Sequence, residues 1–238
     1  VVCFDWRGQG MSDRMIEDSN KQYIEDFSIH IKDLSYIINE VINKNFNRPL
    51  FGIGHSMGGH LLLLSQKNNQ KNFKAIILSA PMLGFKYEKI LFLLSNCMKI
   101  FSKKNKYFLF SKPNMGKETP FEQNDLTSDL IRYKRTQKLV RKKPSIRLWG
   151  VTNAWVNATK NSLNKMRKKN WYKLINTPIC IINPLSDRVV NPEKTKEMAN
   201  NLQNCRIHNI ENCEHEILME KDSLRSDFWK IFDNFIEI

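Results

Sequence analysis

Short apolar runs recur along the 238-residue chain and are separated by longer, more polar stretches. Runs at residues 1–5, 50–53, 75–78, 178–182 and 206–210 predict strands, and most of them contain few polar positions. Strands that are covered on both faces have this continuous apolar character, whereas half-exposed strands alternate apolar with polar residues. The runs therefore predict a buried and largely parallel sheet.

Amphipathic stretches lie between these runs. Apolar residues recur at helical spacing at residues 27–41 and 224–235, and residues 60–65 predict a helix too apolar to be exposed. Asn191 and Pro192 predict a helix start, with Asn191 as the N-cap residue and Pro192 in the first position. Strands that alternate with helices indicate an α/β fold with a mostly parallel central sheet and helices on both faces.

The alternation is interrupted between residue 81 and about residue 173. Strand signals vanish there, and aromatic, Met-rich and Lys-rich helical stretches replace them, as at residues 90–101 and 125–142. A long insertion between two strands is most simply a helical cap over the C-terminal edge of the sheet. We therefore expect one domain over residues 1–238, with a cap inserted at about residues 83–173.

A serine lies in a cluster of glycines directly after the second apolar run. In the segment GIGHSMGG, Gly54 and Gly58 flank Ser56 with one residue between. Gly-x-Ser-x-Gly between a strand and a helix places the serine on a tight, strained turn with its hydroxyl exposed at the sheet edge. A Cβ at Gly54 or Gly58 is expected to collide with the neighbouring strand or helix, and Gly59 is expected to let the helix lie close. Ser56 is therefore the predicted nucleophile.

A serine nucleophile needs a base, and the base needs an acid that orients it. After such an elbow, the acid follows a later strand and the base follows the last one. Asp187 is the only carboxylate in the loop after residues 178–182, and His215 is the only histidine in the loop after residues 206–210. The chain order therefore predicts a catalytic triad of Ser56, His215 and Asp187.

Other titratable residues near these motifs receive structural interpretations. His30 is expected on the surface of a helix, and His55 is expected to pack behind the sheet as part of the elbow. Glu214 and Glu216, on either side of the predicted base, are interpreted as loop and helix-start charges rather than triad members.

Acyl transfer also needs two backbone N–H donors for the oxyanion. Met57, the residue after the nucleophile, is expected to supply one, and a loop after an earlier strand normally supplies the other. The chain begins at Val1 inside a predicted strand, so we expect the N-terminal strands and the second donor to be missing from this sequence. Loss of one donor typically lowers the rate by about 10²–10³-fold.

The formal net charge of +14 is concentrated in the predicted cap. Residues 84–170 hold 21 Lys and Arg against 5 Asp and Glu, a net charge of +16, whereas the rest of the chain carries a net charge of −2. No recognised nucleic-acid motif accompanies the charge, so no nucleic-acid partner is expected. Lysines alternate with apolar residues at 98–108, which suggests peripheral contact with an anionic membrane. Compositional drift toward Lys, Asn and Ile is the alternative explanation.

Composition also bounds the cellular setting. The longest apolar tract, near residues 90–94, is much shorter than the roughly 20 residues that a membrane span needs. The five cysteines are odd in number and form no C-x-x-C pair, which suits reduced thiols in a cytoplasm. We therefore expect a cytoplasmic protein with peripheral contact at the inner face of the membrane.

Several motifs together resemble the α/β-hydrolase superfamily. They are the segment Asp5-x-Arg7-Gly8-x-Gly10-x-Ser12, the elbow Gly-His-Ser-Met-Gly-Gly, residues 186–190 and the late His215. Within the superfamily, the chain is similar to the monoacylglycerol lipase-like group and, more narrowly, to bacterial lysophospholipase L2. The narrower likeness covers nearly the whole chain and rests on residues 80–84, 132–133, 144–147 and 215–222.

The resemblance implies hydrolysis of the single acyl ester of a lysophospholipid. Ser56 would form an acyl-enzyme, His215 would act as general base and then general acid, and Asp187 would hold the imidazole. No metal or organic cofactor is implied. Two alternatives use the same residues: a monoacylglycerol lipase or general carboxylesterase, and a catalytically impaired, truncated hydrolase or binding module. An aminopeptidase on the same scaffold is a further alternative, but the sequence shows no evident acidic cluster that would bind the amino terminus of a peptide.

Overall fold

The structure is a computed structural model that describes residues 1–109, 111 and 119–237. Its strands are β1 (Lys21–Gln22), β2 (Phe51–His55), β3 (Ala75–Ser79), β4 (Gly150–Val151), β5 (Ile179–Pro184) and β6 (Cys205–Ile210). Its α-helices are α1 (Ser28–Tyr36), α2 (Asn43–Asn45), α3 (Met57–Asn69), α4 (Glu88–Phe101), α5 (Leu130–Lys142), α6 (Asn153–Met166), α7 (Lys169–Tyr172), α8 (Pro192–Ala199) and α9 (Asp222–Ile236). A π-helical segment η1 (Ile37–Ile42) follows α1, and there are 3-10 turns η2 (Gln70–Asn72), η3 (Phe121–Gln123), η4 (Pro144–Ile146) and η5 (Ile217–Met219).

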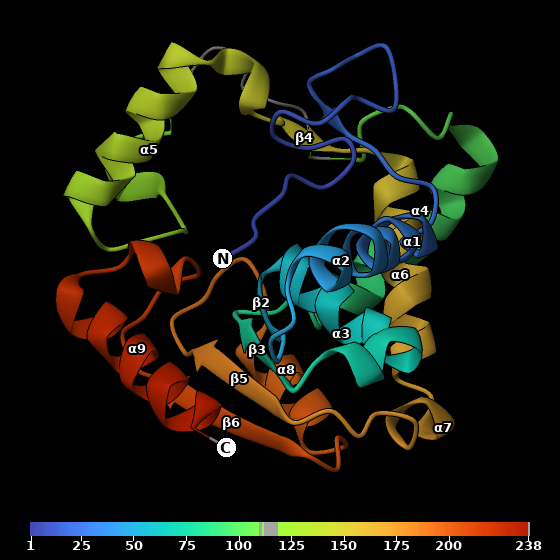
Figure 1. Ribbon diagram of the computed structural model, residues 1–238. Coiled ribbons are helices and arrows are strands. Elements are labelled where there is room, and N and C mark those ends of the chain that lie inside the picture. Colours follow the sequence, from blue (N-terminus) through green and yellow to red (C-terminus); the bar gives the residue numbers. More distant parts are fainter. Residues whose placement is uncertain (110, 112–118, 238) are drawn as a thin grey trace.

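The main sheet has the order β2-β3-β5-β6, and all its neighbouring strands are parallel. In Figure 1, α3 lies on one side of this sheet together with α1 and α6, and α9 lies on the other side. Parallel strands need crossover connections, and the helices that supply them cover both faces of the sheet. This arrangement confirms the predicted α/β fold.

Side chains of the two central strands point alternately into two hydrophobic cores. Ile76, Leu78 and Ile181 belong to the core shared with α1, α3 and α6, whereas Ile77 and Cys180 belong to the core beneath α9. All of these side chains are completely buried. Full burial of a large aliphatic side chain contributes about 1.5–3 kcal/mol. The double-sided burial explains why the predicted strands read as continuous apolar runs.

The first predicted strand is wrong. Residues 1–5 form no strand and are paired with none of the strands in the described residues. The chain instead folds back on Asp5, whose carboxylate accepts a hydrogen bond from the Met11 N–H at 2.9 Å. The Ser12 hydroxyl donates to the Asp5 carbonyl at 2.7 Å. On the described sheet β2 is consequently an edge strand, and Ile53 at its centre is 50% exposed.

Helices dominate the described residues between β3 and β5. Part of this insertion belongs to the body of the molecule, since Leu163 and Met166 of α6 are completely buried in the core that contains α3. The helix α5 lies apart from that layer, on the side toward which β5 points (Figure 1). We propose that residues 83–173 form the expected cap, with α5 as its outer part.

Candidate active site

Ser56 is the residue at which β2 turns into α3. Its backbone has φ +52° and ψ −118°, a combination that is rare outside glycine and costs on the order of 1–3 kcal/mol. Three backbone hydrogen bonds of 3.0 Å hold it: Ser56 N–H donates to the Ser79 carbonyl, and the Ser56 carbonyl accepts from the N–H groups of His60 and Met82. The strained turn is therefore fixed both by its own helix and by the loop that follows β3.

The glycines around Ser56 differ in the space they leave. A Cβ at Gly54 would lie 2.7 Å from the Gly58 carbonyl oxygen, and a Cβ at Gly59 would lie 2.9 Å from the Gly54 oxygen and 3.1 Å from Pro81 Cβ. The expected crowding is thus confirmed for Gly54 and Gly59. It is wrong for Gly58, where the nearest atom to a Cβ would be Trp6 Nε1 at 3.9 Å. That position faces away from β2, so it does not restrict the approach of helix to strand.

The three predicted triad side chains meet in one hydrogen-bonded row. His215 Nε2 lies 2.9 Å from Ser56 Oγ, and His215 Nδ1 lies 2.6 Å from Asp187 Oδ2. The other carboxylate oxygen of Asp187 accepts hydrogen bonds from the N–H groups of Val189 at 2.7 Å and Val190 at 2.9 Å. Because Nδ1 faces a carboxylate, the neutral ring carries its proton there and leaves Nε2 free to accept the serine proton.

The hydrogen-bonded row of Ser56, His215 and Asp187 is largely shielded from water. The Asp187 side chain has no exposed surface and the His215 side chain is 5% exposed, while Ser56 is half-buried at the end of β2. A hydrogen-bonded pair is stronger in such a low-dielectric setting than in water. The arrangement can therefore activate a serine hydroxyl that a substrate is still able to reach.

Met57 is the first residue of α3, and its backbone N–H group lies at the helix end next to Ser56. Helix geometry leaves its N–H group without an intrahelical acceptor, because the bond that closes the first turn runs from His60 N–H to the Ser56 carbonyl. An N–H at this helix end suits an anion that forms next to Ser56. Met57 thus stands where the sequence predicts an oxyanion donor.

Comparison with protein families decides where the chain belongs. A family model described as serine aminopeptidase, S33, matches residues 1–222. The chain belongs to this family. It is a serine hydrolase with the α/β-hydrolase fold, in agreement with the resemblance that its motifs carry.

Individual relatives lie within the same superfamily. The probable lysophospholipase L2 of Haemophilus influenzae is 28% identical over 240 residues, which cover 100% of this chain and 75% of the relative. Lysophospholipase L2 of Escherichia coli is 25% identical over 236 residues, covering 95% of this chain and 68% of the relative. A solved structure of a soluble variant of monoglyceride lipase from Saccharomyces cerevisiae, in complex with a substrate analog, has a TM-score of 0.73 at 16% identity. That match covers 98% of this chain and 76% of the yeast chain, and it shows the fold alone.

Two further histidines of this family member lie close to the triad. The His55 ring lies against His215, with ring centroids 4.8 Å apart, so the expectation that it packs behind the sheet is wrong. The His60 ring is completely buried, with Nδ1 2.8 Å from the Met82 carbonyl oxygen and Nε2 2.8 Å from Ser162 Oγ. Burial lowers the pKa of His60 to about 4, so this ring is neutral at physiological pH. It ties the first turn of α3 to α6.

His30 is not the surface residue that the sequence suggested. It is 2% exposed, and its ring lies 5.4 Å from that of Trp6 and 6.0 Å from that of Phe27. Burial lowers the pKa of His30 to about 4. The sequence did contain a signal for this position, because residue 30 falls on the same helical stripe as Phe27, Ile31 and Leu34.

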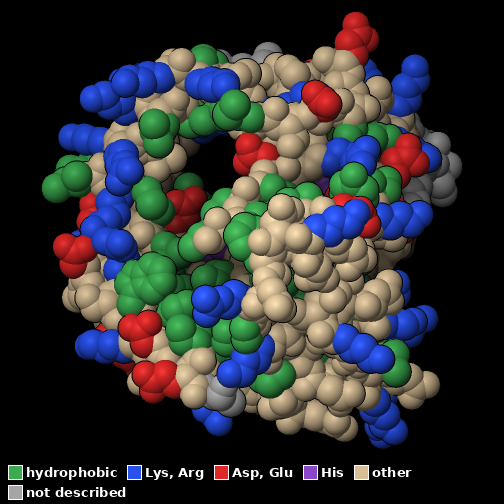
Figure 2. All heavy atoms as spheres, viewed as in Figure 1, with side chains coloured by type: hydrophobic (Ala, Val, Ile, Leu, Met, Phe, Trp, Pro, Cys, Tyr) green, Lys and Arg blue, Asp and Glu red, His purple; other side chains and the backbone are tan. Residues whose placement is uncertain are grey.

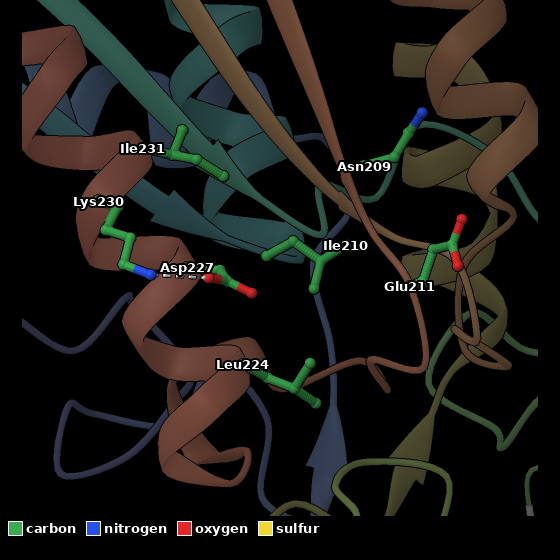
Figure 3. A pocket seen from close by; sticks show the side chains of 7 residues that line it. All are labelled: Asn209, Ile210, Glu211, Leu224, Asp227, Lys230 and Ile231. Atoms are coloured by element: carbon green, nitrogen blue, oxygen red, sulfur yellow. Dashed lines mark hydrogen bonds and ion pairs between the residues drawn. The ribbon is translucent and has the colours of Figure 1, made fainter.

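A hollow of about 390 Å³ lies between the end of β6 and α9 (Figure 3). Its lining residues come from those two elements and the turn after β6: Asn209, Ile210, Glu211, Leu224, Asp227, Lys230 and Ile231. Asp227 and Lys230, on its rim, pair with each other at 3.5 Å. None of the lining side chains belongs to the triad, so we assign this hollow no part in the chemistry.

Proposed function

We propose that the protein hydrolyses the acyl ester of a single-chain lipid, most specifically a lysophospholipid. The observation that carries this proposal is the placement of His215 between Ser56 Oγ and the buried carboxylate of Asp187. The likeness to lysophospholipases L2 over at least 95% of the chain supports the choice of substrate class.

In this proposal Ser56 Oγ attacks the ester carbonyl carbon while His215 Nε2 takes the serine proton. Negative charge on the carbonyl oxygen is stabilised by the Met57 N–H. The carbon–oxygen bond to the glycerophospho alcohol then breaks, and His215 returns the proton to the leaving oxygen. A water molecule, deprotonated in turn by His215, attacks the acyl carbon. The bond from that carbon to Ser56 Oγ then breaks, His215 returns the proton to Oγ, and the fatty acid is released. Asp187 stays ionised throughout and stabilises the imidazolium.

Substrate preference tests the proposed class directly. We expect kcat/KM for a lysophospholipid to exceed that for a monoacylglycerol of equal chain length by about tenfold, the effect of about 1.4 kcal/mol of added binding between a phosphate and the cationic cap. Release of fatty acid from mixed micelles measures both. The reverse order would favour a monoacylglycerol lipase. Turnover of an amino-acid amide but not of either ester would contradict ester hydrolysis altogether and favour the aminopeptidase activity that the family description names.

The outer face of α5 supports contact with an anionic membrane. Ile131 is 80% exposed and Leu139 is 53% exposed, and they share the exposed surface of the helix with Lys134, Arg135 and Lys138. Figure 2 shows Lys and Arg side chains gathered along the side of the molecule on which α5 lies. Exposed apolar side chains flanked by cations are typical of helices that lie in a bilayer interface. We therefore propose peripheral binding through α5.

The stretch 98–108, which suggested this contact in the sequence, is described only in part, because the side chains of residues 99–101 lie outside the description. Among the described residues, no helix is both long enough and apolar enough to cross a bilayer.

Vesicle binding should depend on lipid charge and on α5. We expect binding to rise with the fraction of phosphatidylglycerol and to fall with salt, and Lys134→Glu/Lys138→Glu to weaken it by roughly 30-fold, since each surface cation contributes about 1 kcal/mol. Lys67→Glu/Lys71→Glu makes the same charge change at exposed positions on the α3 side of the molecule and should have a much smaller effect. Vesicle sedimentation measures this. Equal binding to neutral vesicles at every salt concentration would refute the contact.

A further inference from the structure

The loop that carries His215 is joined to the base of the cap. The Glu216 N–H donates to the Leu126 carbonyl at 2.7 Å, and the Thr127 hydroxyl donates to the Met219 carbonyl at 2.7 Å. Leu126 and Thr127 lie shortly before α5, so the chain entering the outer cap helix is hydrogen-bonded to the residues directly after His215.

The contact between residues 126–128 and residues 214–220 is called the joint below. One buried carboxylate lies at its centre. Glu220 has no exposed surface. Its oxygens accept hydrogen bonds from the Ser128 N–H at 3.1 Å and hydroxyl at 2.6 Å, from the Glu214 N–H at 3.0 Å and from the Lys221 N–H at 3.3 Å. Ser128 precedes Asp129, the N-cap residue of α5, and Glu214 precedes His215. A single side chain therefore connects the start of the cap helix with the backbone next to the proposed base.

The two oxygens of Glu220 serve different partners. Oε1 accepts the N–H groups of Ser128 and Glu214, and Oε2 accepts the Ser128 hydroxyl and the Lys221 N–H. A buried N–H group that loses its acceptor costs free energy. The hydrogen bond to Oε1 therefore stabilises the position of the Glu214 backbone. This predicts that an amide in place of the carboxylate can retain the bond to Glu214 but not all four bonds.

Arginine side chains extend the joint on both sides. Arg132 donates from Nη1 to the Glu220 carbonyl at 2.6 Å and pairs through Nη2 with Asp222 at 2.6 Å. Arg188, the residue after Asp187, pairs with Glu214 at 3.1 Å and with Asp125 at 3.3 Å. The loops of the proposed acid and the proposed base are thus both attached to the residues that lead into α5.

We propose that Glu220 is a positioning residue for His215, and that it couples the position of the cap helix α5 to the geometry of the triad. It holds the backbone before His215 so that Nε2 remains within 2.9 Å of Ser56 Oγ. A shift of α5 then moves the imidazole and changes the rate of proton transfer rather than the binding of substrate. The inference rests on the proposed function in that His215 is the base.

The test compares Glu220→Ala and Glu220→Gln with the unaltered protein. A displacement of about 1 Å at a reacting group can lower a rate by about 10²-fold. We therefore expect Glu220→Ala to lower kcat on a lysophospholipid about 100-fold with KM changed less than about threefold, and Glu220→Gln to recover about tenfold of that loss. The pH profile of Ser56 labelling by a fluorophosphonate should shift in both variants, because the contact between His215 and Asp187 is loosened. A merely structural role would leave that profile unchanged in the folded protein.

Asp222→Asn is the matched control, since it alters an exposed partner of the same joint without touching the Glu220 carboxylate, and it should leave the labelling profile unchanged. If Glu220→Ala does not fold by circular dichroism, Glu220→Gln decides the question. A Glu220→Gln protein that is labelled at the unaltered rate with the unaltered pH profile overturns the inference. Absence of labelling in the unaltered protein would instead overturn the proposed function, so the two failures are distinguishable.

Discussion

Replacing Ser56 by alanine is expected to lower kcat for ester hydrolysis by about 10⁴–10⁶-fold and to abolish covalent labelling by a fluorophosphonate. The hydroxyl is the only triad atom that bonds to the acyl group in the proposed reaction, so nothing else in the hydrogen-bonded row can replace it. His215→Ala should cost nearly as much, because His215 Nε2 is the base that lies 2.9 Å from Ser56 Oγ. Asp187→Asn should lower kcat about 10⁴-fold, since an amide stabilises the wrong tautomer of His215.

These losses are not expected to add. The three residues act as a unit, so the triple variant should be little slower than Ser56→Ala alone. Ser79→Ala is a suitable control, because its side-chain oxygen is buried next to the elbow and has no hydrogen-bond partner among the described residues. Kinetics on a lysophospholipid and mass spectrometry of the labelled protein provide the measurements. Labelling that persists in Ser56→Ala, or wild-type labelling in His215→Ala, would contradict the assignment.

Gly54→Ala is expected to destabilise the protein by about 3 kcal/mol or more and to inactivate it, whereas Gly58→Ala is expected to be tolerated. A Cβ at Gly54 would overlap the backbone of α3 at 2.7–2.8 Å, and backbone cannot rotate away as a side chain can. At Gly58 the closest atom would be 3.9 Å away. Alanine is also the better helix former by about 1 kcal/mol, so Gly58→Ala can even stabilise α3.

Denaturant unfolding of the two variants, with fluorophosphonate labelling of the folded fraction, measures the difference. The pair is well matched, because each glycine lies two residues from Ser56 and each change adds one methyl group. Equal destabilisation by both substitutions would show that the spacing of the motif, rather than the packing of α3 on β2, determines the need for glycine.

Local patterns in the sequence predicted much of the fold. The expected strands at residues 50–53, 75–78, 178–182 and 206–210 correspond to β2, β3, β5 and β6, with ends that differ by at most two residues. The N-cap role of Asn191 is confirmed, since its side chain accepts hydrogen bonds from the N–H groups of Glu193 and Lys194. Such features depend on residues close together in the chain, so one sequence suffices to predict them.

The sequence by itself determined that a serine follows an early strand, an acid a later strand and a histidine the last strand, in the order that an α/β-hydrolase elbow requires. The tertiary structure decided which glycines are crowded, that His30 is buried, that residues 1–5 form no strand, and that Glu220 joins the segment before α5 to the loop of His215. Glu220 and Ser128 are 92 residues apart in the chain, so no local pattern in the sequence predicts their contact. The physical reason is that propensity and periodicity act over a few residues, whereas packing and buried hydrogen bonds arise only when distant segments meet.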